Sequence, residues 1–294
     1  MKNLMIPALA LFLSAAAQAD DSPLWMRYCA ISPDGQTIAF SYQGDIYTVP
    51  SSGGKARQLT THPAHDTRPV WSPDGQKIAF ASNRSGNFDV FLMNKEGGEP
   101  KRLTTHSTNE YPTTFKDNGH ILYLANILQD AKDIQFPGTR FMQVYEISTD
   151  GGRPDLYSSL YMENIALSKD GSKLLYNDYK GYEDPWRKHH QSSITRDIWL
   201  CTLGKDRSFR KVTTFGGEDR NPVWAADGAS FYYLSEEKGS FNIFKKDLAG
   251  NSEKQITTHT THPCVSLPPI IPGLYAIVTT ARSIPLRKAR NLPR

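Results

Sequence analysis

The chain has 294 residues, of which 38% are hydrophobic and 22% charged, and it contains 19 prolines and 21 glycines. This length allows one large domain or two small ones, and the many turn-forming residues favour an all-β fold. The net charge of +4 does not indicate nucleic-acid binding, because residues 20–263 carry 28 basic and 30 acidic side chains and so lack the basic surface that such binding needs.

The first 19 residues have the features of a secretory signal peptide. Lys2 precedes an apolar run from Leu4 to Ala16, and Ala17-Gln18-Ala19 supplies small residues at a cleavage site. The run is shorter than the about 20 apolar residues that span a bilayer. We therefore predict an exported, periplasmic protein with a signal peptide at 1–19 and no membrane span after cleavage.

A unit of four short strands then occurs five times. In the clearest copy, Pro69–Trp71 and Lys77–Ala81 flank an Asp-Gly turn, Asp89–Met93 follows, and Arg102–His106 ends the unit. Asp-Gly and Asn-Gly tolerate the positive φ of tight hairpins. The copies are predicted at about residues 24–62, 63–106, 107–158, 159–215 and 216–259.

The second strand of each copy is a continuous apolar run, such as Ile38-Ala39-Phe40 and Ile78-Ala79-Phe80. Such runs are typical of strands that are covered on both faces. A repeat of about 40 to 50 residues with four strands predicts a β-propeller. We expect residues 20–263 to form an all-β propeller of five four-stranded blades plus the start of a sixth, which corresponds to an incomplete six-bladed ring.

Two copies carry insertions between their second and third strands, at about residues 126–141 and 178–196. In an up-and-down blade these loops open on one face, so the two insertions are expected to be neighbours. Long loops in compact domains are often functional. The face that bears them is predicted to bind peptides or a protein partner, and packing on the scaffold or on another domain is the alternative.

The repeat stops after Pro263. Residues 264–294 contain five basic residues, no acidic residue and no further Asp-Gly turn. This segment is predicted to be a non-repeat tail, with a shifted reading frame near Cys264 as one explanation and a natural short propeller as the other. Because an incomplete ring leaves blade faces uncovered, we expect it to be partly open or prone to aggregation.

Histidine and cysteine do not predict a metal or redox site. His62, His106 and His259 occupy one position of the repeat that is Phe215 in the fourth copy, which favours an architectural role. The three cysteines are widely spaced without a Cys-x-x-Cys pair. Cys201 is interpreted as a buried apolar residue, and a disulfide is left open. No metal and no cofactor are predicted.

Asp66, Glu110 and Asp219 each fall five residues before the aromatic residue of the first strand. They are candidates for an acidic ring on the insertion face. The alternative is that each caps its crossover loop through nearby backbone N–H groups. The chain has no Gly-x-Ser-x-Gly segment, and no catalytic residue is predicted.

The repeat resembles TolB-like and tricorn-like propeller repeats through Ser72-Pro73-Asp74-Gly75 and Ile78–Ser82. It is more similar to the N-terminal propeller of tricorn-like proteases, through residues 81–91, 182–190 and 215–222. In that family two propellers precede a PDZ-like domain and a serine peptidase core, and they guide peptides. The resemblance implies that Arg140 lies in the loop that holds the carboxylate of the substrate.

Three functions remain open from the sequence. The first is the propeller part of an exported tricorn-like serine peptidase, which guides peptides and has no catalytic domain in this chain. The second is a stand-alone, TolB-like periplasmic interaction propeller. The third is the propeller of a prolyl-oligopeptidase-like enzyme, which requires a downstream hydrolase domain.

Overall fold

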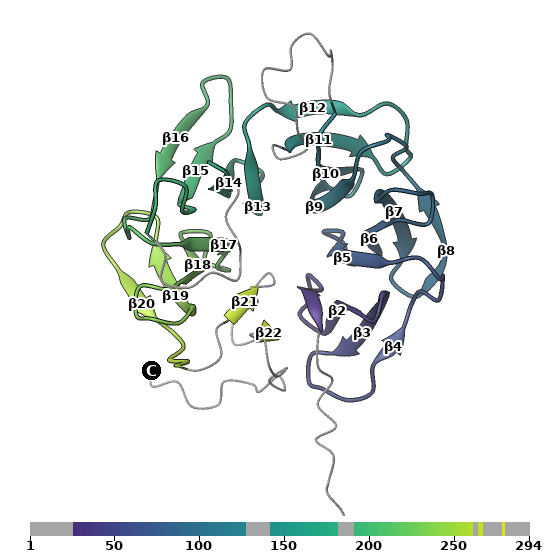
Figure 1. Cartoon of the computed structure of the whole chain (residues 1–294), viewed down its shortest axis with the longest axis horizontal. Coiled ribbons are helices and arrows are strands. Elements are labelled where there is room, and N and C mark those ends of the chain that lie inside the picture. The colour runs from purple at the N-terminus through teal and green to yellow at the C-terminus, as the bar shows by residue number, and fades with distance from the viewer. Residues whose placement is uncertain (1–25, 128–141, 182–190, 261–263, 267–277, 280–294) are drawn as a thin grey trace, which may run out of the picture.

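Five four-stranded antiparallel sheets stand around a central axis in the computed structural model (Figure 1). The structure describes residues 26–127, 142–181, 191–260, 264–266 and 278–279. In every sheet the strands follow one another in chain order, so each sheet is an up-and-down meander. The first strand of each sheet lies nearest the axis.

The blades are numbered along the chain. Their strands are β1 (Arg27–Ile31), β2 (Thr37–Tyr42), β3 (Asp45–Pro50) and β4 (Arg57–Gln58) in blade 1; β5 (Asp66–Trp71), β6 (Lys77–Ser82), β7 (Asp89–Asn94) and β8 (Gly97–Arg102) in blade 2; β9 (Glu110–Asp117), β10 (His120–Ala125), β11 (Gln143–Ser148) and β12 (Asp155–Ser158) in blade 3; β13 (Met162–Leu167), β14 (Lys173–Asp178), β15 (Ile198–Thr202) and β16 (Ser208–Lys211) in blade 4; and β17 (Asp219–Trp224), β18 (Ser230–Ser235), β19 (Asn242–Asp247) and β20 (Glu253–Gln255) in blade 5.

The turn between the first two strands is fixed by local hydrogen bonds. In blade 2 the Ser72 hydroxyl donates to the Asp74 carboxylate at 2.6 Å and accepts from the Lys77 amide at 2.9 Å. Gly75 has a φ of 66°, in the left-handed region that favours glycine. The Ser-Pro-Asp-Gly segment therefore forms a hydrogen-bonded turn that leads directly into the second strand.

The main hydrophobic cores lie between blades. In β6, Ile78 and Phe80 pack against blade 1, whereas Ala79 packs against blade 3. Cys201 is buried between blades 3 and 4, as expected. Both faces of the second strand are thus covered, which explains why its sequence is continuously apolar.

The first strands share an irregularity close to the axis. Pairing with the second strand is interrupted by a β-bulge, and four bulge residues have a positive φ. These residues are Tyr28, Arg68, Asn164 and Asn221, with φ values of 52°, 55°, 49° and 55°. Blade 3 has Pro112 at this position, and its bulge lies one residue further on, because proline cannot adopt a positive φ.

An opening separates blade 5 from blade 1 (Figure 1). A two-stranded sheet lies there, formed by β21 (Cys264–Ser266) and β22 (Val278–Thr279), with β21 beside β18. The prediction of an all-β propeller with five four-stranded blades is confirmed. The described residues contain no sixth four-stranded blade, and none of their segments forms a helix long and apolar enough to cross a bilayer.

Candidate binding site on the insertion face

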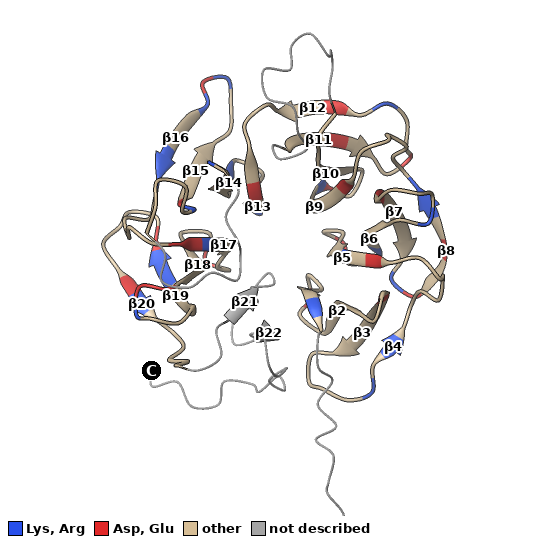
Figure 2. Cartoon of the chain, in the orientation of Figure 1, with Lys and Arg blue, Asp and Glu red and all other residues tan. Residues whose placement is uncertain are grey.

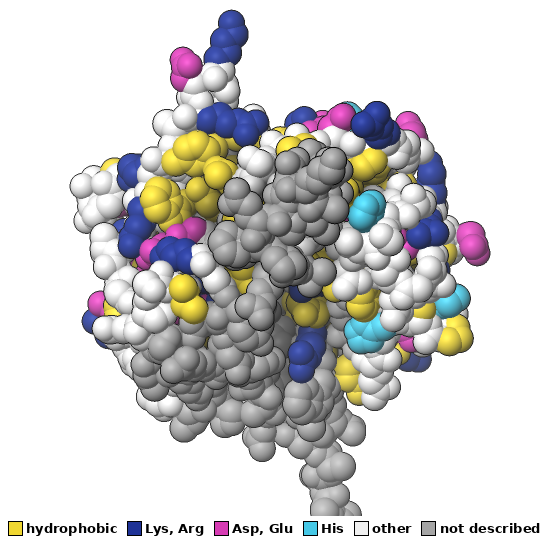
Figure 3. Space-filling model, turned by 45° about the horizontal axis from the view of Figure 1, so that its top comes forward, with side chains coloured by type: hydrophobic (Ala, Val, Ile, Leu, Met, Phe, Trp, Pro, Cys, Tyr) yellow, Lys and Arg dark blue, Asp and Glu magenta, His cyan; other side chains and the backbone are white. Residues whose placement is uncertain are grey.

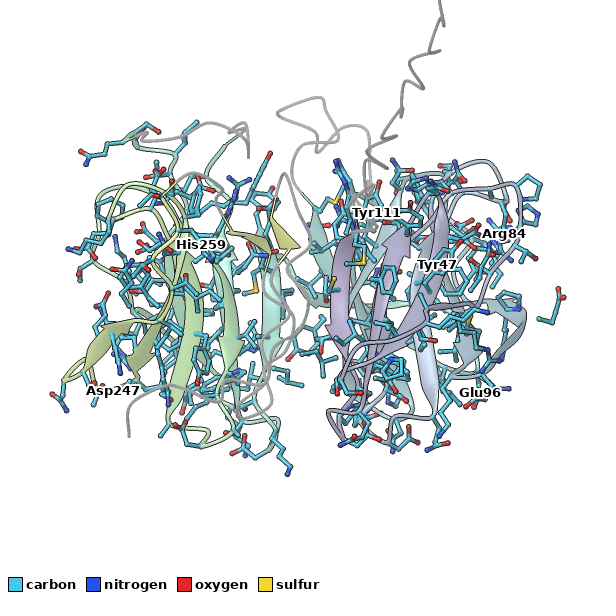
Figure 4. The ribbon with its side chains drawn as sticks, turned by 90° about the horizontal axis from the view of Figure 1, so that it is seen from below. Tyr47, Arg84, Glu96, Tyr111, Asp247 and His259 are labelled. Carbon is cyan, nitrogen blue, oxygen red and sulfur yellow. The ribbon has the colours of Figure 1, made fainter. Side chains whose placement is uncertain are left out.

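The insertion face is the end of the ring at which the second strand of each blade ends and the third begins. The predicted insertions open there, because they join β10 to β11 and β14 to β15. Figure 4 shows Tyr111 and Arg84 toward this end, and Glu96 and Asp247 toward the opposite end. The segments 128–141 and 182–190 lie outside the described residues, as does Arg140.

The three acidic candidates occupy equivalent places at the start of β5, β9 and β17, where Figure 2 shows acidic segments on the inner strands. Asp66, Glu110 and Asp219 are at most 1% exposed. Their backbone amides donate to Gly44, Phe88 and Arg196 of the preceding blade. Each therefore joins two blades, and a role of the set in ligand binding stays a prediction.

Asp66 is neutralised by an arginine from its own blade. The Arg84 guanidinium donates to both Asp66 carboxylate oxygens, at 3.1 and 2.9 Å. Arg84 also donates to the Ser82 hydroxyl and lies 4.8 Å from the centre of the Phe91 ring. This pairing gives a buried carboxylate the partner that its burial requires.

Glu110 has a different environment, beside the Asp89 carboxyl group. The pKa of Glu110 is raised to about 7: burial is the largest cause and the charge of Asp89 acts in the same direction, whereas the Thr104 hydroxyl lowers it. Burial also raises the pKa of Asp89, whose carboxylate pairs with Arg102 at 2.8 Å. Two adjacent buried carboxyls favour a shared proton at the boundary of blades 2 and 3.

Within the described residues, Asp219 has no cation partner of this kind. Burial raises its pKa to about 7, against hydrogen bonds from the Ser235 and Thr213 hydroxyls that lower it. The same repeat position thus carries an ion pair in blade 2 and protonatable carboxyls in blades 3 and 5.

The hairpin between β6 and β7 belongs to one of the segments that carry the family resemblance. Its Asn83 side chain accepts from the His65 amide at 2.8 Å, and its Asn87 side chain donates to the His106 and Thr108 carbonyls. Together with Arg84, these contacts fix the crossovers on both sides of blade 2. The function of this hairpin is therefore to hold the insertion face in shape.

Arg68 is a candidate binding residue that the sequence did not predict. It is the bulge residue of β5, half-buried on an inner strand. Its guanidinium carbon lies 4.2 Å from the centre of the Tyr111 ring and 5.2 Å from that of Tyr28. Among the described residues it has no hydrogen-bond or ion-pair partner, so its N–H groups are available to a ligand.

Further rings extend this contact across the face. Phe88 lies 5.5 Å from Tyr111 between ring centres, and His65 lies 6.1 Å from Phe88. Tyr28, Tyr111 and the Phe88–His65 pair thus join blades 1, 2 and 3 into one aromatic surface around Arg68. Aromatic side chains beside an arginine are typical of protein and peptide binding surfaces.

The boundary of blades 4 and 5 carries buried charges instead. Arg196, at the end of the second insertion, pairs with Glu163 at 2.8 Å and with Glu218 at 3.1 Å. Arg220 lies 3.7 Å from Glu218 and 4.1 Å from the centre of the Phe241 ring. This ion network anchors the base of the insertion.

The histidines serve the crossover turns. The ring nitrogen Nδ1 of His62 accepts from the Ala64 amide at 3.0 Å, and that of His106 from the Thr108 amide at 3.2 Å. Within the described part of the chain, no three histidine, cysteine or acidic side chains are grouped for a metal. In the space-filling view, lysine and arginine side chains are spread out and mixed with acidic ones (Figure 3).

The fold and this face define the class: a β-propeller that carries, near one end of its inner strands, an arginine held against aromatic rings. Residues 23–268 match the model of the tricorn protease N-terminal beta propeller domain, and the chain belongs to that family.

Relatives and solved structures agree with this assignment. The chain is 23% identical over 247 residues to a tricorn protease homolog of Saccharolobus solfataricus, covering 81% of this chain and 22% of that protein. It is 24% identical over 237 residues to tricorn protease homolog 1 of Streptomyces coelicolor, covering 80% and 21%. The chain thus spans about a fifth of the length of these curated relatives.

Two solved structures show the same fold. The crystal structure of the tricorn protease superposes with a TM-score of 0.69 at 20% identity, covering 87% of this chain and 24% of that one. The structure of a putative TolB from Agrobacterium tumefaciens has a TM-score of 0.62 at 17% identity, covering 80% of this chain and 81% of that one.

Proposed function

We propose that this chain is the peptide-guiding propeller of an exported tricorn-like serine peptidase. Peptides bind at the insertion face, around the mouth of the central channel, and a peptidase domain elsewhere in the protein cleaves them. The chain itself contributes binding and no catalytic residue.

The observation that carries this proposal is the state of Arg68. A guanidinium that lies against two tyrosine rings loses little freedom when it binds, because its plane is already held. Its N–H edge matches a peptide carboxylate or carbonyl oxygen. The position on an inner strand places this group beside the channel.

A peptide-binding assay tests the role of Arg68. With fluorescently labelled unstructured peptides, Arg68→Ala should weaken binding about tenfold or more, since hydrogen bonds to charged groups contribute about 1.5–3 kcal/mol. Arg68→Lys should recover only part of the affinity, because ammonium does not reproduce the planar fork. Arg140→Ala, measured in a protein that contains the peptidase core, tests the second anchor.

The matched control is Arg207→Ala. Arg207 lies near the ring of Tyr157, 5.7 Å from its centre, in the turn that precedes β16 on the opposite face. Its removal changes the net charge equally and should leave peptide affinity unchanged. Equal losses for Arg68→Ala and Arg207→Ala, or no loss for Arg68→Ala, would overturn the proposal.

A second candidate is a TolB-like periplasmic interaction propeller. It is favoured by the match to the putative TolB structure, of which this chain covers 81%. This function predicts that the insertion face binds a folded envelope protein and not an unstructured peptide. Binding of a folded partner that Arg68→Ala weakens, without measurable peptide binding, would support it.

A further inference from the structure

A cavity of about 400 Å³ opens on the insertion face at the boundary of blades 1 and 2. Its lining includes Arg27, Tyr28, Ser41, His65 and Thr67, and no acidic residue. This volume lies within the range of pockets that bind small ligands or single side chains.

Two hydroxyls in the lining have no partner. Ser41 is 6% exposed and Thr67 is 5% exposed, and neither hydroxyl oxygen forms a hydrogen bond within the described part of the molecule. Buried polar groups are nearly always hydrogen-bonded in native proteins, because an unpaired one is costly. Two such hydroxyls in one cavity indicate a site that is built for a ligand.

The repeat allows the residues that line this cavity to be compared with the equivalent residues at the boundary of blades 4 and 5. Arg27 pairs with Ser41 across β1 and β2, and Glu163 pairs with Asn177 at the same register of β13 and β14. His65, before blade 2, corresponds to Glu218, before blade 5, because the two residues immediately precede the equivalent residues Asp66 and Asp219. Thr67 corresponds to Arg220 for the same reason.

At the boundary of blades 4 and 5 this place is full. Glu163 and Glu218 hold the Arg196 guanidinium at 2.8 and 3.1 Å. The Asn177 side chain donates to the Asp219 carbonyl at 2.8 Å and accepts from the Asn221 amide at 2.9 Å. Blade 1 has the shorter Ser41 and only Gln43-Gly44 between its strands, so it provides no counterpart of Arg196.

The charges of the two places are opposite. Where Glu163 and Glu218 hold a guanidinium, the first boundary presents Arg27 and His65. We propose that the cavity at the boundary of blades 1 and 2 binds the carboxylate side chain of an acidic residue in a bound peptide. The Ser41 and Thr67 hydroxyls donate to the carboxylate, and Arg27 and His65 supply the complementary charge and donors.

This inference rests on the proposed function and adds a sequence preference to it. The cavity and the Arg68 site share Tyr28, which lines the first and lies against the second. A peptide that reaches Arg68 can therefore place a neighbouring side chain in the cavity. The propeller is expected to prefer peptides with glutamate or aspartate next to the residue held by Arg68.

The experiment uses two pairs of probes. One pair is a labelled peptide with glutamate and its glutamine counterpart. The other pair is N-acetylglutamate amide and N-acetylglutamine amide. Calorimetry and NMR measure the affinity of each probe for the protein. The glutamate member should bind about tenfold more tightly in each pair, given the strength of hydrogen bonds to charged groups. Ser41→Ala and Thr67→Val should each lower the affinity of the glutamate peptide more than that of the glutamine peptide, and so reduce this ratio, because a hydroxyl donates more strongly to a carboxylate than to an amide oxygen.

Stability separates a ligand site from a structural role. Because the two hydroxyls have no partner, Ser41→Ala and Thr67→Val should not lower the midpoint of urea unfolding. Thr105→Val is the matched control, because Thr105 is exposed and lies in blade 2, away from the cavity lining. It should leave the glutamate preference intact.

The outcomes distinguish the two proposals. Equal binding of glutamate and glutamine probes, or a preference that survives both variants, overturns the pocket. If the peptide pair binds through Arg68 without discrimination, the peptide-guiding function stands and the pocket does not. If the small carboxylate binds but no peptide does, the pocket stands and the function fails. Absence of binding by every probe overturns both.

Discussion

At the residue scale, the acidic side chain at one position of the repeat has a different set of partners in each of three blades. Asp66 pairs with Arg84, Glu110 lies beside Asp89, and Asp219 accepts hydrogen bonds from two hydroxyls. The sequence predicted the equivalence of these residues from their spacing. It could not predict their burial or their partners. Arg84 approaches Asp66 from the β6–β7 hairpin and Asp89 approaches Glu110 from β7, and neither contact can be recognised from the residues around the carboxylate in the sequence.

The stability of the protein should fall as pH rises from about 4.5 to 7 because of Glu110. Its pKa is raised from 4.5 to about 7 in the folded state, so in this window the folded chain keeps a proton that the unfolded chain releases. The ionised carboxyl is then buried at a cost of a few kcal/mol. Glu110→Gln should flatten this part of the pH profile in urea unfolding and raise stability at pH 8.

The contrasting variant is Asp66→Asn. It changes the same repeat position by the same chemistry, but it leaves Arg84 without its carboxylate and should lower stability at pH 8. Asp219 contributes a slope in the same window, so the comparison is between the two profiles. Both variants lowering stability at pH 8, or a Glu110→Gln profile that is no less steep than that of the unmodified protein, would contradict the assignment of a protonated Glu110.

At the element scale, a threonine fastens the outer strand of four blades to the third strand. The hydroxyls of Thr60, Thr104, Thr213 and Thr257 accept from the amides of Ile46, Val90, Ile198 and Ile243, at 2.9–3.1 Å. This contact accounts for the first threonine of each Thr-Thr pair, which is bonded in all four blades and buried in three of them, whereas the second threonine is exposed.

Thr104→Val should destabilise the fold by about 1–2 kcal/mol, because it leaves the buried Val90 amide without its acceptor. The adjacent Thr105 is exposed, and Thr105→Val should change the unfolding free energy by less than about 0.5 kcal/mol. Denaturant unfolding of both variants measures the difference. Equal effects would show that the buried hydroxyl does not close the blade.

The blades themselves could be predicted from sequence because each turn and strand is written five times. The bulge could not. Its residues are Tyr28, Arg68, Asn164 and Asn221, and only asparagine among these types is a known sign of positive φ. Arg68 was therefore missed, as were Ser41 and Thr67, whose importance appears only when two blades are placed side by side.

At the scale of the whole molecule, apolar clusters lie on the outer faces of the two blades that end the ring, blade 1 and blade 5. Ile31 and Ile38 lie on the outer face of blade 1, and Leu234 and Ile243 belong to a cluster on the outer face of blade 5. Buried area between blades is what holds a propeller together. These four side chains are at most 3% exposed, so both faces are covered in the folded chain.

Export of the whole molecule should remove its first 19 residues. N-terminal sequencing of the protein recovered from a periplasmic fraction is expected to begin at Asp20, since small residues at Ala17 and Ala19 suit cleavage. Ala19→Trp should block processing and retain a larger precursor, which is visible by gel shift. A mature protein that begins at Met1 would refute the signal peptide, although the propeller assignment would be unaffected.

The boundaries between blades behave as separate compartments. The one between blades 1 and 2 is a cationic cavity, the next holds paired carboxyl groups, and the one between blades 4 and 5 is a filled ion network. Because the same backbone supports all three, a change in one compartment leaves the hydrogen-bonded frame of the others intact. Such a ring can therefore acquire a new ligand preference by substitutions at a single blade boundary, while the other boundaries stay unchanged.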